Sequence, residues 1–371
     1  MALDIGVARI TYGTVLPALR RDLDLSFLAG GVLSAVNLAA YLAGTLVAPR
    51  LPQRIPMRSL ARWGHLVFAA GAAANGIAPD IVTLGFGRVL MGAGAGVGLL
   101  ALFVIVFERT RSDLRPVVSA AVWSGIGLAI VLSGLAAPVL LGAAGSWRGA
   151  FLLSSVLALV VAVEVGRLPP SSAEIPRLGA PQSGARSRPA WAWIGLFGAY
   201  FMFGVGYIAY STFVGGRLAA AHAPMGIVVW SWVSLGLGSI AGSALGAAVL
   251  WSRRWKPLAL VLASLSGAAG SAAAISTGDL LPLVGALLVG LGLASTPAIV
   301  TAFVRERTAD RDYPRLFSFA TAALGVGQLV GPVAAGALAD VLGPDSVMLF
   351  AASAYAAGAV LAAGDLASQR V

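Results

Sequence analysis

One arginine, Arg88, lies inside the long apolar run formed by residues 81–107. A charged guanidinium in a membrane helix costs about 3 kcal/mol or more, so it is retained where it meets water, an acid or backbone carbonyls. Its planar fork of donors also matches a carboxylate or a phosphate. We therefore predict one of two roles for Arg88. It binds an anion in a polar cavity, which we favour, or it ties neighbouring helices together.

The first two apolar runs also carry polar side chains. Arg9 and Tyr12 are three residues apart and share one face of a helix. Ser34, Asn37 and Tyr41 form a polar stripe on an otherwise apolar helix. One such residue needs only an interhelical hydrogen bond worth about 0.6 kcal/mol, but three aligned polar groups favour a wetted face. The residues predicted to line a cavity from these runs are Arg9, Tyr12, Asn37 and Tyr41.

Two later runs add Tyr207 and Gln328 to the predicted cavity. A buried amide without hydrogen-bond partners is costly, so Gln328 is expected to face polar surroundings rather than lipid. For Tyr207 a cavity and a lipid-facing position are equally compatible with the pattern. The tryptophans Trp123, Trp230 and Trp232 are expected to face lipid or the membrane interface, as aromatic residues commonly do.

The chain contains few residues that could serve catalysis, metal binding or proton coupling. Cysteine is absent and the two histidines, His65 and His222, are far apart, so neither a thiolate site nor a histidine pair is available. Asp4 is the one acid well inside an apolar run, and Glu164 and Asp340 lie near the ends of theirs. We therefore expect no catalytic residues, metal or cofactor, and few candidates for proton coupling.

The composition places these residues in membrane-spanning helices. Of the 371 residues, 58% are hydrophobic and only 11% are charged, whereas soluble domains carry about a quarter charged residues. A span needs about 20 apolar residues. Twelve runs of roughly this length are predicted to be spans: 2–19, 26–48, 59–77, 81–107, 116–141, 149–167, 191–214, 224–250, 257–276, 280–304, 316–341 and 346–365. The first is short, and we expect an apolar lead-in upstream of it.

The basic residues indicate the orientation in the membrane. With a cytoplasmic N-terminus, 19 of the 25 Lys and Arg residues fall in cytoplasmic segments and four fall outside. This bias predicts that both termini are cytoplasmic. The net charge of +10 is spread over short gaps between apolar runs rather than along one face, which argues against nucleic acid as a partner.

The chain divides into two similar halves. Residues 168–190 are rich in Pro, Ser and Gly and are predicted to form a cytoplasmic linker between bundles at 1–167 and 191–371. Residues 87–110 align without gaps to 285–308, with a shared Glu-Arg-Thr at the end. The glycines at 92, 94, 96 and 98 are interpreted as helix-packing positions rather than a phosphate loop, because no strand precedes them.

Several of these stretches resemble motifs of the major facilitator superfamily. Arg88 followed by Gly92 and Gly94 resembles the fourth-helix motif. Residues 134–138, GLAAP, and 327–332, GQLVGP, resemble the fifth-helix glycine–proline motif and its repeat.

A narrower resemblance is carried by the N-terminal runs. Residues 6–17, GVARITYGTVLP, resemble the first helix of the YbfB/YjiJ-like branch of the superfamily, and residues 34–44, SAVNLAAYLAG, resemble its second helix. Residues 145–151 resemble the outer turn into the sixth helix. The resemblance covers nearly the whole chain.

The resemblance implies an all-α integral membrane protein with two pseudo-symmetric six-helix bundles around a central cavity. Its expected function is secondary active transport of a small solute across the inner membrane by alternating access, by a monomer. Arg9 and Arg88 would make the cavity positive, which suits an anionic or carboxylate-bearing solute. Efflux of drugs or metabolites by proton antiport is the alternative transport function.

One departure from the family pattern leaves a further alternative open. The loop after the second helix lacks the usual acid, because Ala48 stands four residues after Gly44. A transport-dead sensor or assembly factor is compatible with this change. A membrane enzyme is disfavoured, because the chain has no acid cluster, histidine pair or cysteine.

Overall fold

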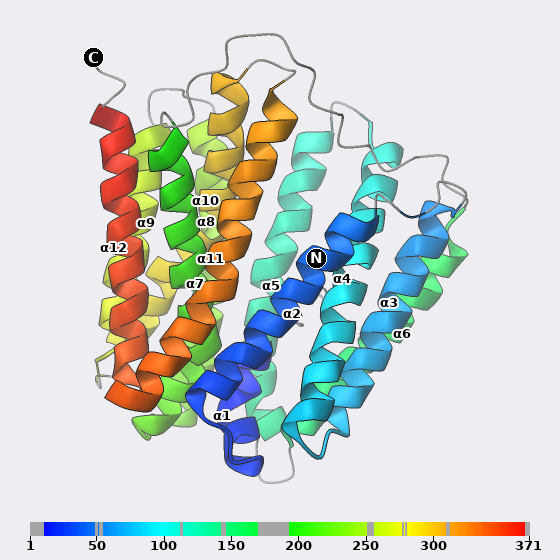
Figure 1. Cartoon of the computed structure of the whole chain (residues 1–371), viewed down its shortest axis with the longest axis vertical. Helices are drawn as coiled ribbons and strands as arrows, with labels where there is room; N and C mark the ends of the chain where they lie inside the picture. The colour runs from blue at the N-terminus through cyan, green and yellow to red at the C-terminus, as the bar shows by residue number, and fades with distance from the viewer. Residues whose placement is uncertain are drawn as a thin grey trace.

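The computed structural model describes residues 11–48, 51, 55–111, 114–141, 146–169, 193–250, 256–276, 278, 280–308 and 312–367. Within these ranges the chain forms twelve α-helices (Figure 1). They are α1 (Tyr12–Asp22), α2 (Phe27–Val47), α3 (Met57–Gly76), α4 (Ile81–Arg109), α5 (Arg115–Leu141), α6 (Trp147–Arg167), α7 (Ile194–Ala220), α8 (Met225–Leu250), α9 (Lys256–Ala273), α10 (Leu281–Arg307), α11 (Tyr313–Leu342) and α12 (Asp345–Ala367).

Helices α2–α12 follow the last eleven predicted spans, and α1 overlaps the end of the first, so the all-α membrane fold is confirmed. Eight helices in the described ranges are long and apolar enough to cross a membrane, and α5 and α9 each contain a shorter apolar stretch. Most of the predicted 168–190 linker, together with Asp4 and Arg9, lies outside the described residues. The division into bundles at 1–167 and 191–371 stays a prediction.

Local sequence explains where several helices begin and end. The hydroxyl of Ser26 accepts a hydrogen bond from the N–H of Ala29 at 3.1 Å and so caps the start of α2. The carboxylate of Asp80 caps α4 by accepting from the N–H of Thr83 at 2.8 Å. This hydrogen bond holds the pKa of Asp80 below its usual value. At the end of α11, Gly343 takes a φ of 87°, which glycine adopts without steric cost.

The glycines of α4 allow close packing against two neighbours. A Cβ atom on Gly92 or Gly96 would collide with the backbone of α2, and one on Gly94 would collide with α3. A Cβ atom on Gly98 would meet the ring of His65 in α3 at 2.9 Å. The interpretation of these glycines as packing positions is therefore confirmed.

The repeat predicted from sequence also recurs in the packing. Gly92 approaches the backbone of α2, and its counterpart Gly290 approaches that of α8. Gly87 packs against α3 at Gly71, and its counterpart Gly285 packs against α9 at Gly270. Equivalent glycines thus contact equivalent helices, as expected for two repeats of six helices.

We refer to α1–α6 as the N-terminal half and to α7–α12 as the C-terminal half. Three helices of the N-terminal half pack against the C-terminal half. These contacts are α1 with α7, α2 with α11, and α5 with α8. The half-to-half contacts include backbone approaches at Gly13, Gly31, Gly127 and Gly336. We call the end of the molecule that holds the turn from α1 to α2 the α1–α2 end, at the bottom of Figure 1, and the opposite end the linker end.

Candidate functional site

Arg88 lies two turns from the start of α4 and is only 1% exposed. The Cζ atom of its guanidinium lies 4.1 Å from the centre of the Tyr12 ring in α1, a cation–π contact. Its Nε atom donates a hydrogen bond to the carbonyl oxygen of Leu33 in α2 at 3.3 Å. The hydroxyl of Tyr12 in turn donates to the carbonyl oxygen of Gly30 at 2.8 Å. Arg88 and Tyr12 therefore link α1, α2 and α4.

Asn37 joins the same cluster from α2. Its Nδ2 atom donates to the backbone carbonyl of Arg88 at 2.9 Å, and the side chain is 2% exposed. Tyr41, one turn further along α2, is half-buried against the main core, and its backbone approaches Gly92 and Gly96. The polar stripe predicted on α2 thus contacts α4 at Asn37.

Tyr207 and Gln328 meet in the C-terminal half. The Nε2 atom of Gln328 in α11 donates to the hydroxyl of Tyr207 in α7 at 2.6 Å. The centre of the Tyr207 ring lies 5.1 Å from the centre of the Phe203 ring. The Phe203 ring also packs edge-on against Tyr355 of α12, with 6.2 Å between the ring centres. The hydroxyls of Tyr210 and Tyr355 are buried here and have no hydrogen-bond partner among the described residues. This half therefore has its own buried polar cluster next to stacked aromatic rings.

A polar contact joins the two halves between these clusters. The hydroxyls of Ser34 in α2 and Thr212 in α7 lie 3.3 Å apart, both buried. Next to Thr212, the carbonyl of Ser211 packs closely on Gly13 of α1. Sequence reasoning missed Ser211 and Thr212, although these adjacent small polar residues follow the aromatic positions of α7 and are the available signal.

The tryptophans divide in a way that the sequence did not predict. Trp230 is 55% exposed, as expected for a lipid-facing or interfacial residue. The same expectation is wrong for Trp232, which is 1% exposed and packs between Gly134 of α5 and Gly13 of α1. Glycines on the facing helices make room for its indole. The side chain of Trp123 and all of Arg9 lie outside the described residues.

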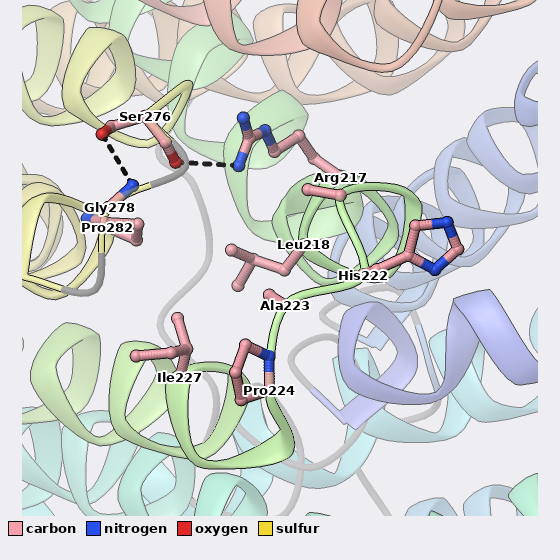
Figure 2. Close-up of a pocket in the computed structure, with 10 residues that line it drawn as sticks. Arg217, Leu218, His222, Ala223, Pro224, Ile227, Ser276, Gly278 and Pro282 are labelled. Atoms are coloured by element: carbon pink, nitrogen blue, oxygen red, sulfur yellow. Dashed lines mark hydrogen bonds between the residues drawn. The ribbon is translucent and has the colours of Figure 1, made fainter.

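A pocket of about 180 Å³ lies at the α1–α2 end of the C-terminal half. Arg217 forms one wall, but its guanidinium is bonded to the carboxylate of Asp345 at 2.9 Å and to the backbone carbonyls of Ser276, at 3.0 Å, and Ile275. Figure 2 shows the bond to Ser276 and shows the His222 ring directed away from the pocket. The hydrogen bonds of Arg217 therefore link the end of α7 to the start of α12 and to the segment that follows α9.

Twelve helices in the described residues, eight of them long and apolar enough to cross a membrane, together with a match to a family model over nearly the whole chain, define a membrane transporter of the major facilitator type. Residues 1–364 match the model of the family described as "Uncharacterised MFS-type transporter YbfB", and the chain belongs to that family. Family and fold thus identify a multi-pass membrane transporter.

Two curated relatives with 26% sequence identity to this chain are also described as transporters. The chain is 26% identical over 160 residues to "Uncharacterized transporter YycB" of Bacillus subtilis, covering 43% of this chain and 40% of that protein. It is 26% identical over 168 residues to "Inner membrane transport protein YdhP" of Escherichia coli, covering 44% of this chain and 42% of that protein. These matches span about two fifths of each relative's length.

Among solved structures, the fold is similar to that of a bacterial homologue of the human lysosomal transporter Spinster. The match has a TM-score of 0.68 at 15% identity and covers 100% of this chain and 94% of the other. That structure is described as inward-facing and occupied. At this identity the similarity supports the fold.

Proposed function

We propose that the protein is a secondary active transporter that moves a small anionic or carboxylate-bearing solute across the inner membrane by alternating access. The observation that carries this proposal is the asymmetry between the two ends of the molecule. At the α1–α2 end, α2 and α11 approach backbone to backbone at Gly31 and Gly336. At the linker end, Phe317 and Phe319 of α11 are 38% and 52% exposed, and Ser318 between them is also exposed.

The exposure at the linker end supports a molecule closed at one end and open at the other. Successive residues of an α-helix point about 100° apart, so residues 317–319 leave a wide arc of α11 uncovered by other helices. Around Gly31 and Gly336, the same helix lies in backbone contact with α2. The arginines near the linker end, with the positive-inside rule, support a cytoplasmic linker end and an α1–α2 end facing outward.

Arg88 is the proposed anion-binding group. The Tyr12 ring and the Leu33 carbonyl fix the orientation of its guanidinium, and a planar guanidinium can bind both oxygens of a carboxylate. Because Arg88 is 1% exposed, the solute reaches it after α1 shifts or Tyr12 rotates. Because α1 packs mainly against α7 of the other half, movement of one half against the other would free α1 for that step. Asn37, Tyr41, Tyr207 and Gln328 are proposed to contribute neutral hydrogen-bonding groups.

The solute class is tested first with the purified protein. Small carboxylates, phosphates, amines and neutral drugs are screened by thermal shift, because a ligand that binds the folded protein raises its apparent stability. Solutes that bind are then followed by counterflow in proteoliposomes. We expect carboxylates to stabilise the protein and to exchange. Exchange restricted to cationic or neutral compounds would contradict an anionic substrate, and binding without any flux would indicate a sensor.

The orientation has its own test. A reporter enzyme that is active only outside the cytoplasm is fused at Ala180, within the predicted linker, and a second fusion is made at Ile77, in the turn between α3 and α4. We expect the Ala180 fusion to be silent and the Ile77 fusion to be active. The reverse pattern would overturn the proposed topology.

A further inference from the structure

The start of α2 receives two of its hydrogen bonds from the opposite half of the molecule. The first N–H groups of a helix have no acceptor within it. The carboxylate of Asp340, near the end of α11, accepts from the backbone N–H of Phe27 at 2.7 Å and of Leu28 at 2.9 Å. Together with the Ser26 cap on Ala29, these bonds satisfy the first turn of α2. A carboxylate from one half therefore caps a helix of the other.

The helices beneath this contact are too close to slide freely. A Cβ atom on Gly336, one turn before Asp340, would lie 2.6 Å from the carbonyl oxygen of Phe27 and 2.9 Å from the Cα of Leu28. A Cβ atom on Gly31 would likewise collide with the carbonyl of Pro332. This crossing aims the carboxylate at the positive end of the α2 dipole. The two halves are thus joined at the α1–α2 end by packing and by charge.

A positive side chain also faces Asp340. Arg20 of α1 donates from Nε to the carbonyl of Leu25 at 3.0 Å, and its Cζ lies 3.3 Å from the centre of the Phe27 ring. Its charge acts on Asp340 through space. The guanidinium and the start of α2 both favour the ionised form of this carboxylate over the neutral acid.

The other charged groups described at this end bond within one half or lie exposed. Asp22 pairs with Arg148, both in the N-terminal half, at 2.5 Å. Asp345 pairs with Arg217, both in the C-terminal half, at 2.9 Å. The remaining charged or titratable residues of the α1–α2 turn and the α7–α8 turn are Arg21, Asp24 and His222, and all three are exposed. Asp80, in the turn between α3 and α4, caps α4 within the N-terminal half. Of the four carboxylates with hydrogen bonds described at this end, Asp340 is the one that bridges the halves.

We propose that Asp340 is a proton-sensitive latch, whose ionised carboxylate holds the α1–α2 end closed and whose protonation releases it. A neutral acid loses its attraction to the helix dipole and to Arg20, and it accepts hydrogen bonds less strongly. Because the closed state favours the charged form, opening takes up a proton, and a fall in pH favours opening. Asp340 is exposed, so the proton comes from the adjoining solution. This inference rests on the proposed alternating access, and we propose the proton as the ion that is coupled to this transport cycle.

The latch is tested by measuring the distance between the halves. The chain contains no cysteine, so Ile77→Cys and Leu280→Cys, at positions 72% and 69% exposed in opposite halves, accept spin labels without background. Pulsed electron paramagnetic resonance is recorded in lipid nanodiscs without substrate. At neutral pH, Asp340→Asn should shift the distances to longer values. Asp340→Glu should restore the shorter distances, and Asp22→Asn, the matched carboxylate within one half, should leave them unchanged.

Acidification provides the second arm. Lowering the pH from about 7 to about 3, below the usual aspartate pKa of about 3.9, should lengthen the distances in the unmodified background and in Asp22→Asn. Asp340→Asn, already open, should respond much less. Unchanged distances in folded Asp340→Asn, or an equal pH response with and without Asp340, would overturn the latch. Because no solute is present, either result is separate from a failure of the anion-transport proposal, which counterflow measures.

Discussion

The guanidinium of Arg88 stacks on the ring of Tyr12, with the Cζ atom 4.1 Å from the ring centre. Tyr12 is itself anchored to α2 through the carbonyl of Gly30, and Arg88 to α2 through that of Leu33. The same buried arginine thus has the contacts of a helix tie and the chemistry of an anion site. The two roles differ in what its removal does to stability and to transport.

The close approach of α2 and α4 should be sensitive to a single methyl group. In Gly92→Ala the new Cβ would lie 2.9 Å from the Cβ of Ala40 and closer still to the carbonyl of Asn37. We expect a loss of about 1–3 kcal/mol, typical of overpacking, seen as a lower melting temperature in detergent. Gly149→Ala in α6 is the control, because no atom lies within 4 Å of its new Cβ. Equal melting temperatures for the two variants would contradict the packing.

The hydrogen bond between Gln328 and Tyr207 should appear in a double-mutant cycle. Gln328→Leu and Tyr207→Phe each remove one partner of a 2.6 Å bond. Interhelical hydrogen bonds in membranes average about 0.6 kcal/mol, so we expect a coupling energy of this size in the stability of the reconstituted protein. Strictly additive effects of the two changes would show that the bond contributes nothing.

The ion pair between Asp22 and Arg148 predicts a pH dependence of stability. The hydrogen bonds that the Asp22 carboxylate accepts from Arg148 and Trp147 hold the pKa of Asp22 below its usual value. A carboxyl with a lowered pKa in the folded state stabilises the fold above its unfolded pKa, about 3.9, and the stabilisation disappears as the pH falls through the folded value. Asp22→Asn should therefore lower the melting temperature at neutral pH, with a difference that shrinks in strong acid. A difference that is constant with pH would argue against the ion pair.

Much of the fold follows from the sequence because hydrophobic length is a direct requirement of the bilayer. The helix bounds therefore follow the apolar runs closely, as for α4 at Ile81–Arg109 against the predicted 81–107. The repeat was also visible, because equivalent glycines serve equivalent helix contacts. Which helix faces which is a property of the whole bundle, so the contact between Ser34 and Thr212 and the burial of Trp232 were not predictable from local patterns.

The candidate site was predictable in part for the same reason. Buried polar groups in a membrane need partners, which singled out Asn37, Arg88 and Gln328 from sequence. Their partners lie on other helices, and residue spacing says nothing about them. The cap that Asp340 provides to α2 is such a case, because the two elements are more than 300 residues apart.

Transport by Arg88 variants tests the central claim most directly. Arg88→Ala and Arg88→Lys are reconstituted, the folded fraction is measured, and carboxylate counterflow is expressed per folded molecule. The corresponding position of the repeat is Ala286, so alanine is compatible with this helix packing. We expect Arg88→Ala to abolish transport while the protein remains folded, and Arg88→Lys to recover little, because lysine lacks the planar fork. Transport at the unmodified rate per folded Arg88→Ala molecule, accompanied by a lower melting temperature, would contradict the anion site and leave Arg88 as a helix tie.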